Sequence, residues 1–258
     1  MAKTVYEIMH KNRKVARIDD TGFCKIYYKT FMPYNLYFEE DLSTNGCFPK
    51  AWKRVKNGFV LLKDGGSESV ERELLASKIC QCFDVSQVVY TEDVFDHEKV
   101  TRSENITSKD YSIASMELME IYAQNHDRDI QKYILSLDRH NYYMMNIIDY
   151  LVGNTDRHWG NWGVLVKTSN NKPVALHKLM DFNQAFYSYD TMEGANCQTT
   201  FGVKMNQQEA AAEAVKKIGM HQLHDIKREW FSKLPQYYEM FTKRYNYLKR
   251  YDDYSGSL

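Results

Sequence analysis

Residues 152–165 read VGNTDRHWGNWGVL, a stretch in which polar and apolar residues are sharply divided. Asp156, Arg157, His158 and Asn161 lie close together, with one apolar segment before them and another after them. Polar side chains gather in this way where a chain leaves a packed core to form a site.

The preceding segment, NYYMMNIIDYLVGN, predicts a buried helix. Met144, Ile148 and Leu151 lie at positions i, i+4 and i+7, which share one helical face. The following segment predicts a hairpin, in which WGVLV is a strand, KTSNNKP a turn, and VALHKLM a second apolar run that ends at Asp181. Because a hairpin returns the chain to its start, the polar stretch is expected beside Asp181.

One carboxylate, one carboxamide and a second carboxylate then converge, which is the set that phosphoryl transfer requires. Asp156 is placed to accept the proton of an attacking hydroxyl, and Asn161 and Asp181 supply hard oxygen ligands for magnesium. The five-residue spacing from Asp156 to Asn161 is that of kinase catalytic loops, and Asp181 opens a second metal motif that continues with Phe182 and Asn183.

Each of these residues alone also has an ordinary structural interpretation, such as a helix cap, a half-buried histidine or a turn. The combination with the hairpin favours the catalytic interpretation. Three other acids make a useful comparison, because HDRD at 126–129 and DRHN at 138–141 look similar. Asp127, Asp129 and Asp138 have no asparagine five positions later, so loop or helix-end roles are expected for them.

The first part of the chain predicts antiparallel strands followed by a helix. KVARI and FCKIYY flank a turn, the Asn57-Gly58 pair precedes the strand FVLLK, and SESVERELLASKICQCF predicts a helix capped by Ser67 or Ser69. Alternation along FVLLK directs Lys63 toward a cleft, where Glu73 on the helix is its expected partner and Glu71 a rival. An ordinary lysine at a strand end is the alternative.

A loop with the sequence DLSTNGCFPKAW, at residues 41–52, is a candidate to cover phosphates through Gly46 and Lys50. The alternative, an ordinary surface turn, is equally compatible with this stretch. Neither a G-x-x-x-x-G-K-[ST] nor a G-x-G-x-x-G pattern occurs, which disfavours P-loop and Rossmann sites. VVYTEDVF and YSIASMELM are expected to be the last strands of the first part of the chain. From about residue 118 the sequence pattern becomes mainly helical. Pro235 is expected to start or kink a helix in that later part.

Composition excludes several classes of function. The 258 residues are 43% hydrophobic, and 34 Lys and Arg balance 34 Asp and Glu, so no net charge favours nucleic acid or an anionic membrane as a direct partner. The five cysteines have no zinc spacing, and no signal peptide or membrane span is evident, which predicts a cytoplasmic protein. The expected domains are a strand-rich lobe at 1–117 and a helical lobe at 118–258.

Five segments resemble, in their order, the HipA-like kinases: STNGCFPKAW, FVLLKDGG, ERELLAS, NTDRHWGN and MDFNQAF. The resemblance spans roughly residues 40–190, and its DRHxxN and DF parts also resemble phosphatidylinositol kinases. It implies an α+β, two-lobed protein-kinase-like fold, with an antiparallel β-rich N-lobe and a mainly helical C-lobe. It also implies ATP and Mg2+ as cofactors and transfer of phosphate to Ser or Thr of a protein, with autophosphorylation.

The site residues implied by the resemblance include Asp156 as base, with His158 supporting the loop, and Asn161 and Asp181 as metal ligands. Lys63, held by Glu73, is assigned to the phosphates.

The resemblance extends to the rest of the nucleotide site and to regulation. It places an adenine-binding hinge near Glu117 to Met119 and makes Ser43 and Thr44 the candidates for autophosphorylation. An antitoxin-like regulator is a possible partner, whereas the family's extra N-terminal β domain has little room in this length. Asn183 departs from the glycine of the usual metal motif. A lipid or small-molecule kinase and a nucleotide-binding pseudokinase are the alternative functions.

Overall fold

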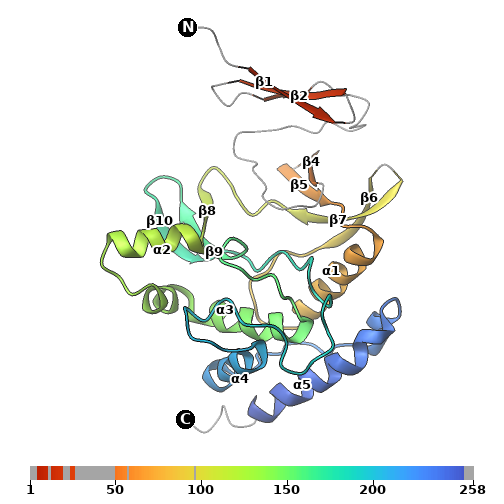
Figure 1. Cartoon of the computed structure of the whole chain (residues 1–258), viewed down its shortest axis with the longest axis vertical. Coiled ribbons are helices and arrows are strands. Elements are labelled where there is room, and N and C mark those ends of the chain that lie inside the picture. Colours follow the sequence, from red (N-terminus) through yellow and green to blue (C-terminus); the bar gives the residue numbers. More distant parts are fainter. Residues whose placement is uncertain are drawn as a thin grey trace.

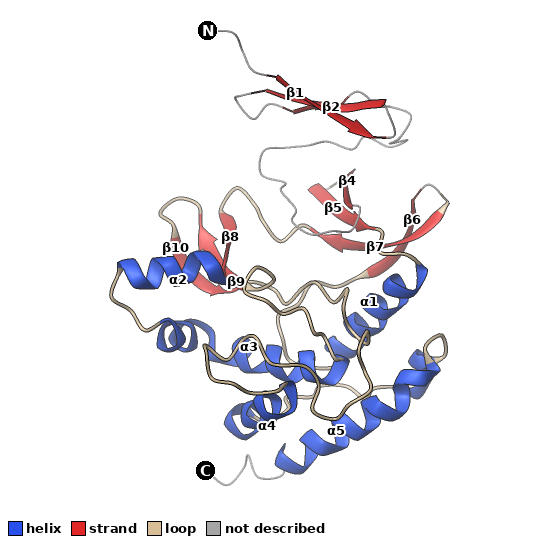
Figure 2. Ribbon diagram, in the orientation of Figure 1, coloured by secondary structure: helices blue, strands red, loops and turns tan. Residues whose placement is uncertain are grey.

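The structure is a computed structural model that describes residues 5–10, 13–19, 24–26 and 50–252, except residues 57 and 96. The candidates Gly46, Ser43 and Thr44 lie outside these ranges. Within them the fold is α+β, with antiparallel sheets and helices (Figure 2). The strands are β1 (Val5–His10), β2 (Arg13–Asp19), β3 (Cys24–Ile26), β4 (Lys50–Val55), β5 (Gly58–Lys63), β6 (Thr91–Phe95), β7 (Glu98–Glu104), β8 (Tyr111–Ser115), β9 (Gly163–Lys167) and β10 (Lys172–Leu176). The α-helices are α1 (Ser67–Cys80), α2 (Met116–Asn125), α3 (Ile130–Val152), α4 (Gln207–Ile218) and α5 (Tyr238–Asp252).

The strands form three separate sheets. One has the order β1-β2-β3, a second β4-β5-β7-β6 and a third β10-β9-β8. The expected hairpin at Asn57-Gly58 is confirmed, because β4 and β5 pair with Val55 opposite Gly58. The same register sets Lys50 opposite Lys63, so the two candidate lysines are paired at one end of the four-stranded sheet.

Helix α1 follows β5 directly, as predicted, but the expected serine cap is wrong. The N-cap is Gly66, at φ 78 and ψ 158, and no side chain caps the helix. Ser67 is already helical, because the chain turns one residue earlier through a backbone conformation that only glycine adopts easily. The turn is held by the Asp64 carboxylate, which accepts a hydrogen bond of 2.9 Å from the Gly66 amide.

The chain leaves the four-stranded sheet at Glu104 and enters the third sheet at Tyr111, so residues 105–110 form the crossing. The strand expected at YSIASMELM ends at Ser115, because its side-chain oxygen accepts from the Leu118 amide and begins helix α2. Two lobes are consistent with this arrangement, with the four-stranded sheet and α1 in one part and α3, α4 and α5 in the other (Figure 1). The boundary expected at residue 117 stays a prediction.

The core of the second part is helix α3, which packs against α2, α4, α5 and strand β10. The predicted inner face is confirmed, since Met144, Ile148 and Leu151 are fully buried. The comparison acids have the expected loop or helix-end positions: Asp127 lies in the turn after α2, Asp129 caps the start of α3, and Asp138 lies at the kink where two helical parts of α3 join and caps the second part.

The last part of the chain agrees with expectation. The NQQEAAAEAVKKI segment forms α4, which begins with a capping box between Asn206 and Glu209. Pro235 begins a short 3-10 turn, Pro235–Tyr237, that leads into α5. None of the described helices is long and apolar enough to cross a bilayer.

Candidate active site

Lys63 lies at the end of β5, where the predicted alternation places it, and it is only 6% exposed. Its ammonium group donates to the Glu73 carboxylate on α1, which is 2% exposed. Thr101 on β7 donates to the other Glu73 oxygen at 2.7 Å. The rival Glu71 is excluded as the partner, because it pairs with Lys99 and Lys233 instead.

The same ammonium group reaches Asp181, at 3.0 Å from its Oδ1. One lysine thus links the four-stranded sheet and α1 to the acid that follows the β9–β10 hairpin. Burial alone would lower the pKa of Lys63, but its anionic neighbours, Glu73 foremost, raise that pKa above its usual value. Lys63 therefore carries a permanent positive charge in a site from which water is largely excluded.

Asp181 is held by its backbone as well as by its side chain. It adopts a left-handed conformation, with φ 60, and its amide donates to the Tyr90 hydroxyl at 3.0 Å. Burial opposes ionisation of the carboxyl, but the charge and hydrogen bond of Lys63, together with the other nearby cations, keep the pKa of Asp181 below its usual range. Lys50 and Arg157 act in the same direction. The carboxylate is therefore ionised at neutral pH, as a metal ligand must be.

The predicted catalytic loop follows the end of α3, and it brings Asp156 and Asn161 into direct contact. The Asn161 side-chain nitrogen donates to the Asp156 backbone carbonyl at 2.8 Å and to its Oδ2 at 3.2 Å. His158 lies on the other side, with Nε2 3.8 Å from Asp156 Oδ1, and its Nδ1 accepts from the Gly160 amide. Asp156 keeps 38% of its side chain exposed, so the carboxylate is fixed in direction yet accessible.

Arg157 is the main support of the site, and sequence reasoning assigned it no role. Its guanidinium is buried and binds both carboxylate oxygens of Asp149 on α3, at 2.8 and 3.0 Å. Nη1 also donates to the backbone carbonyls of Asn161, at 2.9 Å, and Met180, at 2.6 Å. A single cation therefore joins the helix, the catalytic loop and the residue before Asp181.

Asn154 and Phe182 complete the packing beneath the loop. Asn154 is fully buried, and its side-chain nitrogen donates to Asp149 Oδ1 at 3.0 Å and to the Asp181 carbonyl at 3.4 Å. Phe182 is fully buried under the Arg157 guanidinium, which lies 5.8 Å from the ring centroid. These contacts fix the backbone on both sides of the candidate base and metal ligands.

The remaining candidates are placed less directly. Lys50 is half-buried beside Lys63 on the neighbouring strand, close enough to act on the Asp181 charge. Glu117 and Met119 lie within α2, where Met119 is 2% exposed, so neither is part of an extended hinge. The segment that connects the four-stranded sheet to the third sheet is residues 105–110, because β8 already pairs with β9, and the adenine-binding hinge near Glu117 to Met119 stays a prediction.

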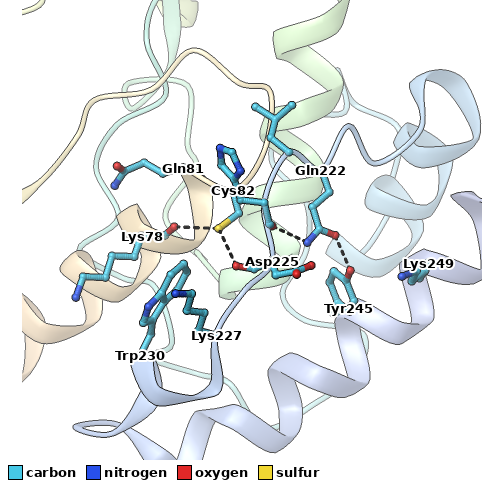
Figure 3. A pocket seen from close by; sticks show the side chains of 11 residues that line it. Lys78, Gln81, Cys82, Gln222, Asp225, Lys227, Trp230, Tyr245 and Lys249 are labelled. Atoms are coloured by element: carbon cyan, nitrogen blue, oxygen red, sulfur yellow. Dashed lines mark hydrogen bonds between the residues drawn. The ribbon is translucent and has the colours of Figure 1, made fainter.

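A large groove among the described residues lies elsewhere. Its volume is about 990 Å³, and it is bounded by the end of α1, the 222–230 segment and α5 (Figure 3). Lys78, Cys82, Gln222, Asp225, Trp230 and Tyr245 line it. None of the candidate catalytic residues does, so size alone does not identify the site, and the assignment rests on the convergence of charged groups at Lys63 and Asp181.

Comparison with known proteins supports the fold. No protein-family model and no curated protein sequence matches the chain. Its structural neighbours include a crystal structure of a Helicobacter pylori proinflammatory kinase, CtkA, with a TM-score of 0.59, 13% identity, and coverage of 85% of this chain and 93% of that one. Another is the Shewanella oneidensis toxin-antitoxin system of HipA and HipB in a complex with its operator DNA, with a TM-score of 0.49, 11% identity, and coverage of 84% and 70%. The likeness to CtkA shows a kinase-like fold, with which a two-lobed arrangement is consistent.

Proposed function

We propose that this protein is a MgATP-dependent kinase that transfers the γ-phosphate to Ser or Thr hydroxyls of a protein. The observation that carries the proposal is the contact of Lys63 with both Glu73 and Asp181. A buried lysine shared by a helix glutamate and the acid after the hairpin is the arrangement that kinases use to hold phosphates. An isolated structural ion pair needs only one acid.

The candidate base is Asp156. Asn161 donates to one of its oxygens and His158 approaches the other, which orients the carboxylate toward an incoming hydroxyl. The carboxylate is exposed enough to accept the hydroxyl proton, and it is oriented before the acceptor arrives.

The residues present fit a metal-nucleotide complex. Asn161 and Asp181 would hold magnesium, because the Asn161 nitrogen faces Asp156 and leaves the carboxamide oxygen directed away from that pair. Lys63 and Lys50 would bind phosphate oxygens. Magnesium, when bound, offsets negative charge on the phosphates. The chain's own contribution is to hold these oxygen and ammonium groups in place through Arg157, Glu73 and Tyr90.

The class of acceptor, the cellular location and the regulator are also part of the proposal. CtkA, whose fold this chain shares, is named a kinase, which supports transfer as the function. A cytoplasmic location, autophosphorylation at Ser43 or Thr44 and an antitoxin-like regulator are proposed with it. A pseudokinase has no chemical need for Asp156 beside Asn161. A lipid or small-molecule acceptor remains the alternative that experiment has to separate.

The test is incorporation of labelled phosphate from MgATP into the purified chain, followed by mass mapping. We expect label on Ser43 or Thr44 in the wild type and a loss of at least about 100-fold in Asp156→Asn and Asp181→Asn. Asp127→Asn is the matched control, because it makes the same change in the similar HDRD sequence, and it should label normally. Equal labelling of wild type and Asp156→Asn would refute the proposal.

If the wild type binds MgATP without labelling itself, a second assay separates the acceptor classes. The chain is given Ser- and Thr-containing peptides in one reaction and phosphatidylinositol vesicles in another. Transfer to peptides alone supports a protein kinase. Transfer to the vesicles alone replaces the proposal with a lipid kinase.

A further inference from the structure

Three potential metal ligands converge at a place that the proposed kinase chemistry does not use. Asp84 follows α1, His140 lies on α3, and His221 follows α4, and one ligand atom from each lies within 4.8 Å of the other two. His140 Nε2 is 3.5 Å from Asp84 Oδ2, and the two imidazole rings meet edge to face with centroids 4.8 Å apart. These are residues from three separate segments of the fold.

Backbone contacts hold the segments of Asp84 and His221 together. Phe83 pairs with Gln222 in an antiparallel bridge, and the Asp84 amide donates to the His221 carbonyl at 2.9 Å. His140 is fixed on the other side, because its Nε2 contacts the Asp84 carbonyl at 2.6 Å. The convergence is therefore built into the packing of α1 against α3 and the 219–224 segment.

An ion pair between Asp84 and His140 explains only part of this cluster. Within the described part of the chain, the His221 imidazole has no hydrogen-bond or ion-pair partner, and Asp84 has no lysine or arginine within ion-pair distance. His221 also adopts a left-handed backbone, with φ 46, which is uncommon for a residue other than glycine. A cation between the two imidazoles and the carboxylate would hold all three.

We propose that Asp84, His140 and His221 form a binding site for a zinc-class divalent cation. Two imidazole nitrogens and one carboxylate oxygen are borderline ligands that suit zinc, with water in the fourth position. Ligand atoms of a tetrahedral zinc site lie about 3.3 Å apart, given bonds of about 2.0 Å. The 3.5 Å between His140 Nε2 and Asp84 Oδ2 is already near that value, and the ligand atoms of all three residues lie within 4.8 Å of one another. Binding of the ion by His140 Nε2 would replace the contact of that nitrogen with the Asp84 carbonyl.

Such an ion would join the segment that follows α1 to helix α3. Helix α1 carries Glu73, and helix α3 leads into the predicted catalytic loop. The segments that hold two of the ligands continue directly into the large groove, where Cys82 and Gln222 are labelled in Figure 3. The proposed metal site therefore lies beside this groove, away from the candidate active site, and its role is to hold the helices together. It does not depend on the proposed kinase activity.

The experiment is equilibrium dialysis of the tag-free full chain against zinc chloride, with thermal unfolding of the same samples. We expect one zinc per chain and a rise in the unfolding midpoint with zinc. His221→Asn tests the site with little risk to folding, because asparagine tolerates the left-handed backbone and keeps the carbonyl that Asp84 contacts. Its zinc affinity should fall at least about tenfold, since even the outer partners of metal ligands are worth that much.

His224→Asn is the matched control, because it removes a nearby exposed histidine outside the cluster. It should bind zinc as the wild type does. Cobalt provides a second readout, since the visible absorption of a four-coordinate ion should appear in the wild type and in His224→Asn but not in His221→Asn. Zinc binding by His221→Asn equal to that of the wild type, or no binding by the wild type at millimolar zinc, would overturn the site.

Discussion

At the scale of single residues, the fold places one cation, Lys63, between two acids, and this arrangement predicts how stability depends on pH. In Lys63→Met the Glu73 carboxyl stays buried without its cation. We expect the free energy of unfolding at about pH 8 to fall by about 3 kcal/mol, the usual cost of removing one partner of a buried pair. Phosphate transfer should be lost as well.

The deficit should shrink in acid. Burial raises the pKa of Glu73 above its ordinary value, and loss of Lys63 raises it further. A raised folded-state pKa means that the folded variant takes up a proton before the unfolded chain does, so its stability is regained as pH falls and lost as pH rises.

Urea unfolding of wild type and variant at about pH 5 and pH 8 measures this difference, which we expect to be at least about 1 kcal/mol. Lys99→Met is the control, because Lys99 pairs with Glu71 and Glu92 near the surface and Glu71 retains Lys233. A Lys63→Met deficit that does not change with pH would show that Glu73 is not ionised in that pair.

The residue scale also shows what the sequence could predict. Asp156 and Asn161 are identifiable because their spacing is local, and Lys63 because strand alternation fixes its face. Arg157 had no assigned role, since its partners come from a helix, a loop and the hairpin end, and only folding brings these together. Asp149 did leave a signal, as an acid inside the apolar run MMNIIDYLV, where a buried charge requires a partner.

At the scale of elements, the end of α3 sets the start of the catalytic loop. Gly153 ends the helix in a left-handed conformation, with φ 61, and a Cβ there would lie 2.3 Å from the Tyr189 ring. Gly153→Ala should lower the free energy of unfolding by about 3 kcal/mol, because it adds backbone strain and a clash. Gly202→Ala, at φ 84 with open space around it, should cost only the strain, about 1 to 2 kcal/mol. Equal losses in chemical denaturation would contradict the clash.

The segment from β10 to Asp181 carries a second element-scale prediction. Burial lowers the pKa of His177 to about 4, and its Nδ1 lies 2.8 Å from the Lys178 carbonyl. A depressed histidine pKa means that the unfolded chain binds the proton first, so stability falls as pH drops from about 6.5 toward 4. Between about pH 7 and pH 5 the loss from this group should be about 2 kcal/mol. His177→Gln should remove that part of the pH dependence in urea unfolding; an unchanged slope would show that His177 is protonated when folded.

Elements also show where local sequence misleads. The run YSIASMELM has strand-like residues throughout, yet β8 stops at Ser115 because that side chain caps α2. Nothing local in the sequence reveals that β8 pairs with β9 instead of with the four-stranded sheet. Pairing between distant strands decides which lobe a segment joins, and a single sequence contains little information on it.

At the scale of the whole molecule, the four-stranded sheet and the hairpin acid meet through Lys63, with Lys50 beside it in register. If both lysines bind phosphates, MgATP stabilises the fold by mass action, by about 2.7 kcal/mol at 100 times the dissociation constant. Lys50→Ala should weaken binding about tenfold and so reduce that gain by about 1.4 kcal/mol at the same nucleotide concentration.

Lys53→Ala is the matched control for Lys50→Ala. It removes a lysine from the same strand, but three positions along, so it projects from the opposite face, where it pairs with Asp93 at 3.3 Å. Its gain with MgATP should equal that of the wild type in thermal unfolding with and without nucleotide. If Lys50→Ala gained as much as Lys53→Ala, Lys50 would not contact the nucleotide, and the phosphates would be held from the Lys63 side alone.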